Sequence, residues 1–282
     1  MHMRRDTKTS MLLLPSGAIY TALLLAPIAL LLRTSLLPEG PGAPLEGPLS
    51  LSSYAALADP YYGAIFVRTL RIAALTTLFC LLLGYPLALS VSRSRGTWRR
   101  LQLLLLVSPL FVSVVVRAYG WMLLLGNRGL VNSALLSIGV IDAPIRLLYS
   151  EGAVVLALVE ALLPFMAISI LAILDRLAPE LEEAARGLGA SKFETFRHVT
   201  LPLSLPGALS GALLVFMVSM GSYATPALIG GARIRVVVTE IYTQVMAVFN
   251  WPLAASLSLT LLALALVVAQ LARRLEARGL ES

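Results

Sequence analysis

The chain has 282 residues, of which 58% are hydrophobic and only 13% charged, and its formal net charge is +7. A soluble domain carries about 25% charged residues, so this composition excludes a water-soluble class for most of the chain and makes lipid the expected solvent. The basic residues lie between apolar runs and not in a patch interleaved with exposed aromatic residues, so nucleic acid is not an expected partner.

Six apolar stretches reach the length of about 20 residues that a bilayer-crossing helix needs. They are Met11–Leu32, Ala64–Val91, Leu101–Leu125, Gly152–Leu174, Leu203–Ile229 and Leu253–Leu271. We therefore expect an all-α, polytopic membrane protein with six transmembrane helices. Basic residues precede the first stretch, as in a signal peptide, but its apolar run is too long for one and no cleavage pattern follows closely. We expect this helix to be retained.

The distribution of lysine and arginine predicts the orientation. The two terminal tails and the loops 92–100 and 175–202 hold fourteen basic residues, whereas the loops 38–63, 126–151 and 230–252 hold four. Basic residues are retained on the cytoplasmic side of a membrane, so both termini are expected in the cytoplasm of a multi-pass protein of the inner or plasma membrane. The loop 38–63 is then external, with a short helix expected at Ser52–Ala58.

The expected organisation has four parts. Residues 1–10 form a cytoplasmic tail, 11–63 the first helix with its external loop, 64–271 a core of five helices, and 272–282 a second cytoplasmic tail.

Glu160 is the one acidic residue inside a predicted span. A charge at the bilayer centre is costly, so this side chain is expected to face the interior of the helix bundle. Arg117, in the preceding span, has roughly the same depth of 12–13 Å below the outer face at 1.5 Å per residue. Two interpretations stay open: a buried ion pair with Arg117, or a carboxylate that faces a cavity and attracts a cationic substrate.

Two further groups of residues are candidates for the substrate path. Ser219, Ser222 and Tyr223 make the fifth span unusually polar, which indicates either tight helix packing or a lining of the path. Tyr119 and Trp121, near the outer end of the third span, are typical of an aromatic belt at the membrane surface, with stacking on a substrate as the alternative.

The loop between the fourth and fifth spans predicts two short helices. Pro179 suits the first position of a helix, and the three glutamates that follow fill a first turn where the helix dipole favours negative charge. Gly187 and Gly189 supply the stop.

Ser191, with Glu194 three residues later, forms a capping-box pattern that opens the second helix. Pro202 is expected to end that helix. The two helices would make a compact cytoplasmic knob.

This loop carries a recognisable motif. Glu183-Ala184-Ala185, then Gly189 and then Val199-Thr200-Leu201-Pro202 match the spacing of the EAA signature of ABC-importer permeases, with Val in place of Ile at one position. The chain therefore resembles that family, and the resemblance implies a type I permease fold with no catalytic residue. It also implies a coupling element that docks on a separate ATPase, made of Glu183, Ala184, Ala185, Gly189, Ser191, Val199, Leu201 and Pro202.

Further short motifs, such as Gly84-Tyr85-Pro86 and Asn250-Trp251-Pro252, resemble the first permease subunit of spermidine/putrescine importers. The resemblance implies a second permease subunit, two ATPase copies and an external solute-binding protein as partners. Import of an anionic solute such as a phosphonate or carboxylate, or of iron or thiamine, is the alternative within the class. An ion-coupled secondary transporter is the alternative outside it.

The chain has no means of hydrolysing ATP by a P-loop. A P-loop places a lysine after a glycine-rich turn, and the two lysines, Lys8 and Lys192, do not follow one. ATP and magnesium are therefore expected on a partner chain. The single cysteine, Cys80, and two separated histidines offer no ligand spacing, so no cofactor or metal is expected on this chain.

Overall fold

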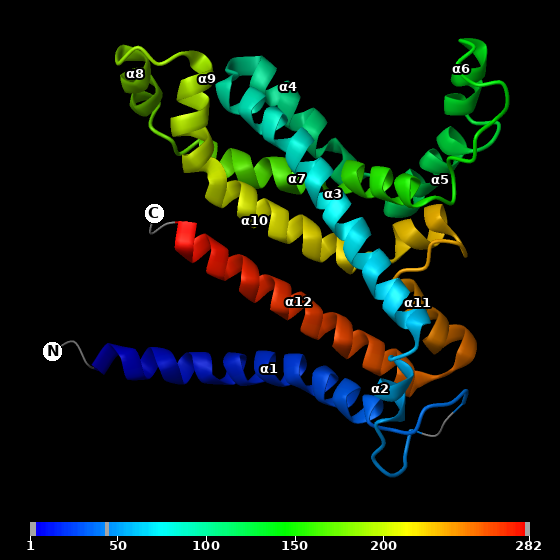
Figure 1. Cartoon of the computed structure of the whole chain (residues 1–282). Helices are drawn as coiled ribbons and strands as arrows, with labels where there is room; N and C mark the ends of the chain where they lie inside the picture. The colour runs from blue at the N-terminus through cyan, green and yellow to red at the C-terminus, as the bar shows by residue number, and fades with distance from the viewer. Residues whose placement is uncertain (1–3, 43–44, 280–282) are drawn as a thin grey trace. The chain divides into compact units, whose positions relative to one another are not determined.

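The computed structural model describes the backbone of residues 4–42 and 45–279 and the side chains of residues 19–42 and 45–274. The part of the chain that it describes folds into helices and loops without a strand (Figure 1). The α-helices are α1 (Arg4–Ser35), α2 (Ser52–Ala56), α3 (Pro60–Arg93), α4 (Gly96–Val107), α5 (Val114–Leu125), α6 (Leu130–Ser137), α7 (Glu151–Leu174), α8 (Pro179–Gly187), α9 (Lys192–Thr195), α10 (Leu201–Met220), α11 (Val237–Thr243) and α12 (Trp251–Gly279). A 3₁₀ turn (Ser108–Phe111) and three π-helical turns (Phe196–Thr200, Pro226–Gly230 and Gln244–Val248) complete the helical structure.

Four helices in the described part of the chain are long and apolar enough to cross a membrane. They are Pro60–Arg93, Glu151–Leu174, Lys192–Met220 and Trp251–Arg274. A fifth is added if the bent pair Gly96–Phe111 and Val114–Ser137 counts as one span. The expected all-helical class is confirmed, whereas the six spans are not confirmed as predicted. Residues 11–18 of the first predicted span have side chains outside the described residues.

The third predicted span, Leu101–Leu125, is not a single helix. Its two halves meet at a bend of 97°. Pro109 lies in the 3₁₀ turn, and Val112 and Ser113 then adopt extended backbone with ψ angles of 130° and 138°. Proline has no N–H for the helical ladder and extended residues cannot continue it, so the apolar run stays long while the helix breaks.

The fifth predicted span, Leu203–Ile229, is also shorter than expected, because α10 ends at Met220. At the other end of α10, the expectation that Pro202 ends the preceding helix is wrong. Helical structure runs without a break over Lys192–Met220. A π-helical turn over Phe196–Thr200 directly precedes the proline, and such a turn changes the hydrogen-bond ladder so that the chain continues helically past the missing N–H.

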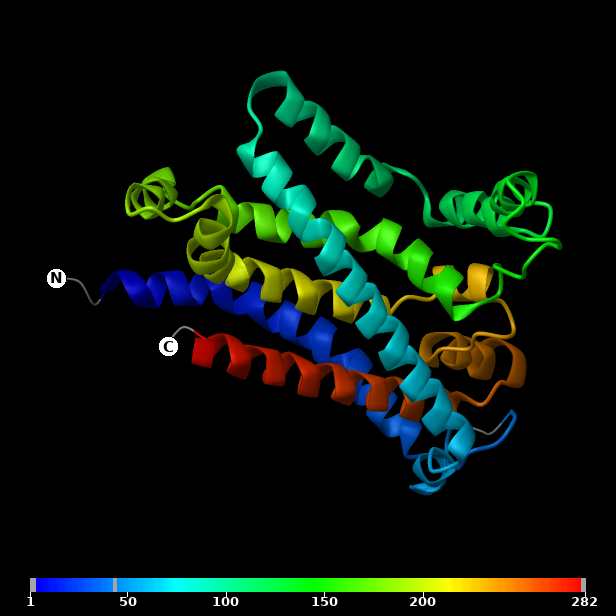
Figure 2. The ribbon, with the colours of Figure 1, turned by 45° about the horizontal axis from the view of Figure 1, so that its top comes forward.

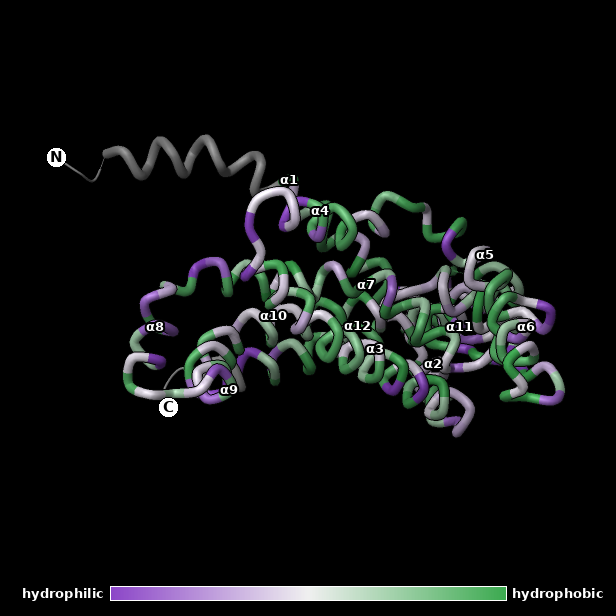
Figure 3. Tube along the Cα trace, turned by 90° about the horizontal axis from the view of Figure 1, so that it is seen from above, coloured by the Kyte–Doolittle hydropathy of each residue, from purple (hydrophilic) through white to green (hydrophobic). Residues whose placement is uncertain are grey.

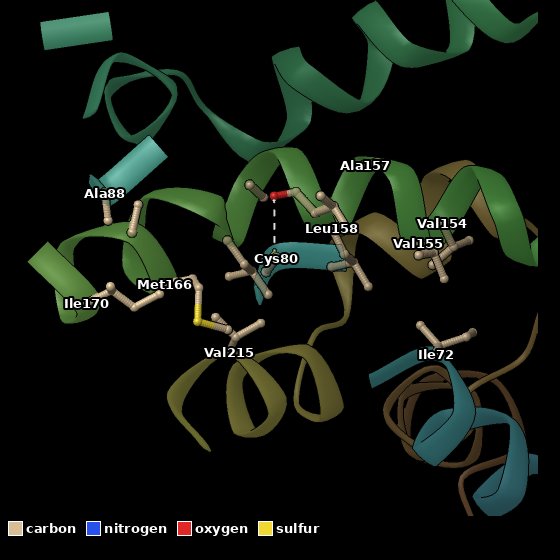
Figure 4. Close-up of a cluster of buried hydrophobic side chains, with 14 of the residues drawn as sticks. Ile72, Cys80, Ala88, Val154, Val155, Ala157, Leu158, Met166, Ile170 and Val215 are labelled. Carbon is tan, nitrogen blue, oxygen red and sulfur yellow. Dashed lines mark hydrogen bonds between the residues drawn. The ribbon is translucent and has the colours of Figure 1, made fainter. Parts of the chain in front are cut away.

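The structure consists of two compact units, residues 1–63 with 240–263 and residues 64–239 with 264–282. In the second unit, α7 lies alongside α10 in both ribbon views (Figures 1 and 2). Glycines allow this approach, because a Cβ on Gly207 would lie 2.8 Å from the carbonyl oxygen of Ser169. α3 completes the core of this unit: Cys80 lies against α7 with its sulfur 3.7 Å from the carbonyl oxygen of Val159 (Figure 4).

The first unit contains α1, the loop that follows it, α2 and the first part of α12. The expected short helix in this loop is present, as α2. Tyr54 of α2 donates to the hydroxyl of Ser35 at 2.9 Å, and the loop is tied to the start of α12 by the N–H of Gly42, which donates to the carbonyl of Phe249 at 3.1 Å. Residues 240–248, part of the predicted loop 230–252, are helical and partly buried.

Candidate functional site: a helical knob and an apolar cavity

The knob between α7 and α10 has the two helices that its caps predict. Gly189 lies in the turn between them with a φ of +92°, a left-handed conformation that side-chain-bearing residues avoid. The predicted capping box is confirmed: the Ser191 hydroxyl accepts from the N–H of Glu194 at 3.2 Å, and the Glu194 carboxylate accepts from the N–H of Ser191 at 2.7 Å. These bonds hold the pKa of Glu194 below its usual range.

Glu182 attaches α8 to the rest of the second unit, a role that the sequence did not indicate. Its carboxylate accepts from the hydroxyl of Thr200 at 2.7 Å and pairs with Arg186 at 3.0 Å and with Arg93 at 3.4 Å. The Thr200 hydrogen bond and the charges of the two arginines lower the pKa of Glu182. The i, i+4 spacing of Glu182 and Arg186 was the only signal in the sequence, and it is a common one.

The predicted coupling residues divide between a groove and its surroundings. A groove of about 450 Å³ on the knob is lined by Ala185, Gly189 and Val199 together with Leu188, Ala190, Glu194, Thr195 and His198. The neighbouring Glu183 and Ala184 are exposed, and Ser191 caps α9. Leu201 and Pro202 lie in the first turn of α10 and do not line the groove.

Two large apolar side chains stand out on the polar surface of the knob. Leu188 is 92% exposed and Phe193 is 68% exposed, on either side of the glycine turn. Hydrophilic and apolar residues alternate along the segment labelled α8 (Figure 3). Exposed apolar residues rimmed by polar ones are typical of a protein contact surface.

The base of the knob packs on α3. The ring of Phe196, in the π-helical turn, meets the ring of Tyr85 edge-on with centroids 5.8 Å apart. The Tyr85 hydroxyl also forms a hydrogen bond of 2.6 Å with the hydroxyl of Ser204 in α10. The knob is therefore joined to both α3 and α10, so a force on the knob reaches two long helices.

Glu160 and Arg117, which the sequence places at equal depth, are in contact. Glu160 of α7 and Arg117 of α5 approach to 3.6 Å between Oε2 and Nε, with 31% of the Glu160 side chain and 16% of the Arg117 side chain exposed. Arg117 also donates to the carbonyl of Pro109 at 3.0 Å, in the turn that breaks the third predicted span. The ion-pair geometry is thus present, and Glu160 faces a cavity as well.

This cavity has a volume of about 500 Å³, and leucine and valine side chains of α3, α4 and α7 form most of its wall. Glu160 and Gln102 are its polar lining residues, and Trp121 adds an aromatic ring. Oε2 of Glu160 and Oε1 of Gln102 are buried without a hydrogen-bond partner among the described residues. Each of these two lining residues therefore has an acceptor oxygen without a donor.

The other candidates for the substrate path lie away from this cavity. Tyr119 is exposed and does not line it. Ser219 is buried near the end of α10, while Ser222 and Tyr223 occupy the irregular stretch that follows. From the predicted set, the structure brings Glu160 and Trp121 to one cavity, with Arg117 in contact with Glu160, and the remaining four do not line this cavity.

Comparison with known proteins identifies the family. Residues 80–279, which include the whole knob, match the family described as the inner membrane component of binding-protein-dependent transport systems. The chain belongs to this permease family. It is a permease subunit of the ABC-importer class, as the EAA spacing predicts, and its relatives in the family are transport subunits and not enzymes.

Two relatives and one solved structure show which permeases this chain is similar to. It is 37% identical over 235 residues to the spermidine/putrescine transport system permease protein PotB of Escherichia coli, covering 83% of this chain and 86% of that one. It is 33% identical over 218 residues to the molybdenum transport system permease protein ModB of Mycobacterium bovis, covering 76% and 80%. The fold matches a chain of a bacterial ABC transporter involved in the import of the acidic polysaccharide alginate, with a TM-score of 0.81, 20% identity and coverage of 98% and 97%.

Proposed function

We propose that this permease imports polyamines such as spermidine and putrescine, and forms half of their translocation path. The observation that carries the proposal is the 37% identity to a spermidine/putrescine permease over 83% of the chain. The cavity supports it, because Glu160 supplies a negative charge and Gln102 a second acceptor oxygen to an ammonium group, which has donors only. The indole ring of Trp121 suits a cation as well.

The proposed assembly contains a second permease subunit, two copies of an ABC ATPase that bind ATP and magnesium, and an external solute-binding protein. Both termini lie in the cytoplasm, so the knob faces the ATPase. Leu188 and Phe193 are the apolar anchors of that contact, with Glu183 beside them. Closure of the ATPase pair on ATP moves the knob, and the attachment of the knob to α3 and α10 transmits the movement to the path.

An anionic solute is the second candidate function. A separate pocket of about 340 Å³ in the second unit is lined by Arg146 and Arg233, together with Asn127, Leu148 and Tyr149. Two arginines without an acidic lining residue suit a carboxylate or an oxyanion. A cargo of this kind would use these arginines instead of Glu160.

The test is uptake by the reconstituted complex with its own binding protein. Labelled putrescine and spermidine are compared with molybdate, for the wild type and for Glu160→Gln. Removing one charged hydrogen-bond acceptor weakens binding by roughly 1.5–3 kcal/mol, so we expect the KM for polyamine to rise about tenfold or more. Glu46→Gln, a change of the same kind at an exposed loop residue outside the cavity, is the control.

Failure of the wild-type complex to move either polyamine would refute the proposal, and uptake of molybdate in its place would favour the anionic cargo. A purely structural ion pair gives a different pattern. In that case Glu160→Gln assembles poorly, and Arg117→Met in the same chain restores assembly by removing the unpaired charge.

A further inference from the structure

The first unit contains a pocket that no part of the proposed path uses. Its volume is about 600 Å³. Three segments line it: the loop after α1, α2 with the first turn of α3, and the stretch from the last π-helical turn to the start of α12. α2 and the start of α12 lie at the same end of α1 in both ribbon views (Figures 1 and 2), which is the external end in the proposed topology.

The polar groups of this pocket are mainly hydrogen-bond acceptors. Glu39 and Asp59 contribute carboxylates, and the residues that line the pocket include neither lysine nor arginine. One oxygen of Asp59 accepts from the N–H of Tyr61 at 2.8 Å, which leaves its second oxygen for a ligand. The Asn250 side-chain oxygen is occupied, because it accepts from the N–H groups of Gly40 and Leu253.

Gln244 provides the observation that points to a ligand. Its side chain lines the pocket and the residue is only 7% exposed. The Nε2 atom of Gln244 donates to Oε1 of Glu240 at 2.8 Å. The Oε1 atom of Gln244 itself is buried without a hydrogen-bond partner among the described residues. A buried acceptor without a partner is costly, and native structures normally supply one.

The hydrogen bond to Glu240 fixes the orientation of the Gln244 side-chain amide. Glu240 is 2% exposed, and its other oxygen accepts from the hydroxyl of Tyr61 at 3.0 Å. A carboxylate only accepts hydrogen bonds, so it must face the NH₂ group of Gln244, and the amide oxygen is the atom left without a partner. The pocket lining therefore includes an amide with an unused acceptor oxygen in addition to two carboxylates.

We infer that this pocket is a binding site for a primary alkylammonium group, held by Glu39, Asp59 and the side-chain oxygen of Gln244. An ammonium group has three N–H donors and no acceptor, which matches the Glu39 carboxylate, the second oxygen of Asp59 and the amide oxygen of Gln244. Tyr62, also in the lining, offers an aromatic ring for the charge. The inference rests on the proposed polyamine cargo, which would reach this site before it enters the path.

A divalent metal ion fits the pocket less well. Hard cations such as calcium take six to eight oxygen ligands, usually with several carboxylates. No group of three or more acidic, histidine or cysteine side chains suited to a metal occurs among the residues that the structure describes. Two carboxylates and a single amide oxygen are few for calcium but sufficient for the three donors of an ammonium group.

The test is calorimetric titration of the full chain in lipid nanodiscs, in a Glu160→Gln background that removes the cavity carboxylate. The probes are 1,4-diaminobutane, tetramethylammonium and calcium chloride. We expect the diamine to bind, and Glu39→Gln or Asp59→Asn to weaken it about threefold to tenfold each. Asp59→Asn keeps an acceptor for the N–H of Tyr61, so α3 remains capped. Glu46→Gln, in the same loop but outside the pocket, should leave the affinity unchanged.

Tetramethylammonium carries the charge of one end of the diamine without its N–H donors, so we expect it to bind at least about tenfold more weakly than the diamine. Equal binding of the two would overturn the role of Gln244. Calcium binding that the double variant Glu39→Gln/Asp59→Asn abolishes, and that the diamine does not displace, would overturn the ammonium assignment. Diamine binding that the double variant leaves unchanged would overturn the site itself.

Uptake by the assembled complex separates this inference from the proposed function. If the wild type transports polyamines and the double variant transports and binds them equally well, the site is wrong while the cargo stands. If the chain binds the diamine through Glu39 and Asp59 and the complex transports no polyamine, the cargo is wrong while the ammonium site stands. Thermal melting of each variant in the same nanodiscs shows whether it is folded.

Discussion

Replacement of Glu182 by alanine should loosen the knob from the rest of the second unit. This carboxylate is the acceptor for Thr200 at 2.7 Å and the partner of Arg93 and Arg186. Alanine keeps the helix propensity of α8 but removes these contacts. The helix itself should therefore remain, while its attachment to the start of α10 is lost.

The size of the effect follows from the exposure of the partners. Thr200 is buried, and a hydrogen bond to a charged group contributes about 1.5–3 kcal/mol when both partners are shielded from water. The Glu182 side chain is 27% exposed and its arginine partners are about half exposed, so the ion pairs add only about 0–1 kcal/mol. Because Glu182 is partly exposed, water reduces its hydrogen-bond contribution below the value for shielded partners. We therefore expect a total loss of about 1–2 kcal/mol, which makes opening of the knob roughly five to thirty times more frequent.

Hydrogen exchange of the full chain in nanodiscs measures this opening directly. Amides of α8 should exchange faster in Glu182→Ala by the factor above, while those of α7 should not change. Glu183→Ala is the matched control, since Glu183 is the adjacent glutamate, is exposed and forms no ion pair within the described part of the chain. Exchange rates in Glu182→Ala that equal those of the control would refute the anchoring role.

The pH dependence provides a second check. The Thr200 hydrogen bond, with the two arginines, lowers the pKa of Glu182. A carboxyl group with a lowered pKa stabilises the folded state above its ordinary pKa, and this stabilisation disappears as the pH falls through the lowered value. The protection of α8, corrected for intrinsic exchange, should therefore stay constant between pH 8 and pH 6. A loss of protection within that range would contradict the assignment.

Three further predictions follow from the structure. Gly189→Val should strain the turn at its φ of +92° and lower transport-coupled ATP hydrolysis in the assembled complex with membrane insertion intact, and an unchanged rate would contradict the coupling role. Gly207→Ala should lower the melting temperature more than Gly211→Ala, because the new Cβ meets backbone at 2.8 Å in the first case and movable side-chain atoms at 3.0 Å in the second. In a cysteine-free background, Ser50→Cys should react with an impermeant thiol reagent in intact cells and Ser282→Cys should not, and labelling of the latter would refute the proposed topology.

The sequence predicted features that depend on neighbours along the chain. The apolar runs predicted the α-helical membrane class, since a bilayer-crossing helix needs only length and hydrophobicity. The capping box at Ser191 and Glu194 formed as expected, because its two hydrogen bonds lie within four residues of each other. The EAA spacing predicted the family for the same reason, as it is a pattern within a single loop.

Apolar length alone did not predict where the helices break. The third predicted span is apolar over most of its length but bends by 97° after Pro109. Pro202, expected to end a helix, is instead accommodated by the π-helical turn before it. The hydrogen-bond ladder around each proline decides between these outcomes, and the packing of the surrounding helices determines that ladder.

Only the tertiary structure decided which polar groups meet. It selected Glu182 and not Glu183 as the anchor of the knob, although both fit the same helical turn. It also placed Gln244, with Glu240 behind it, at the pocket that contains Glu39, just over two hundred residues earlier in the chain. Helical periodicity determines which face of its own helix a residue occupies. Whether that face meets an acid, a hydroxyl or lipid depends on the segments that fold against it, because charges and hydrogen bonds act over a few ångströms in space.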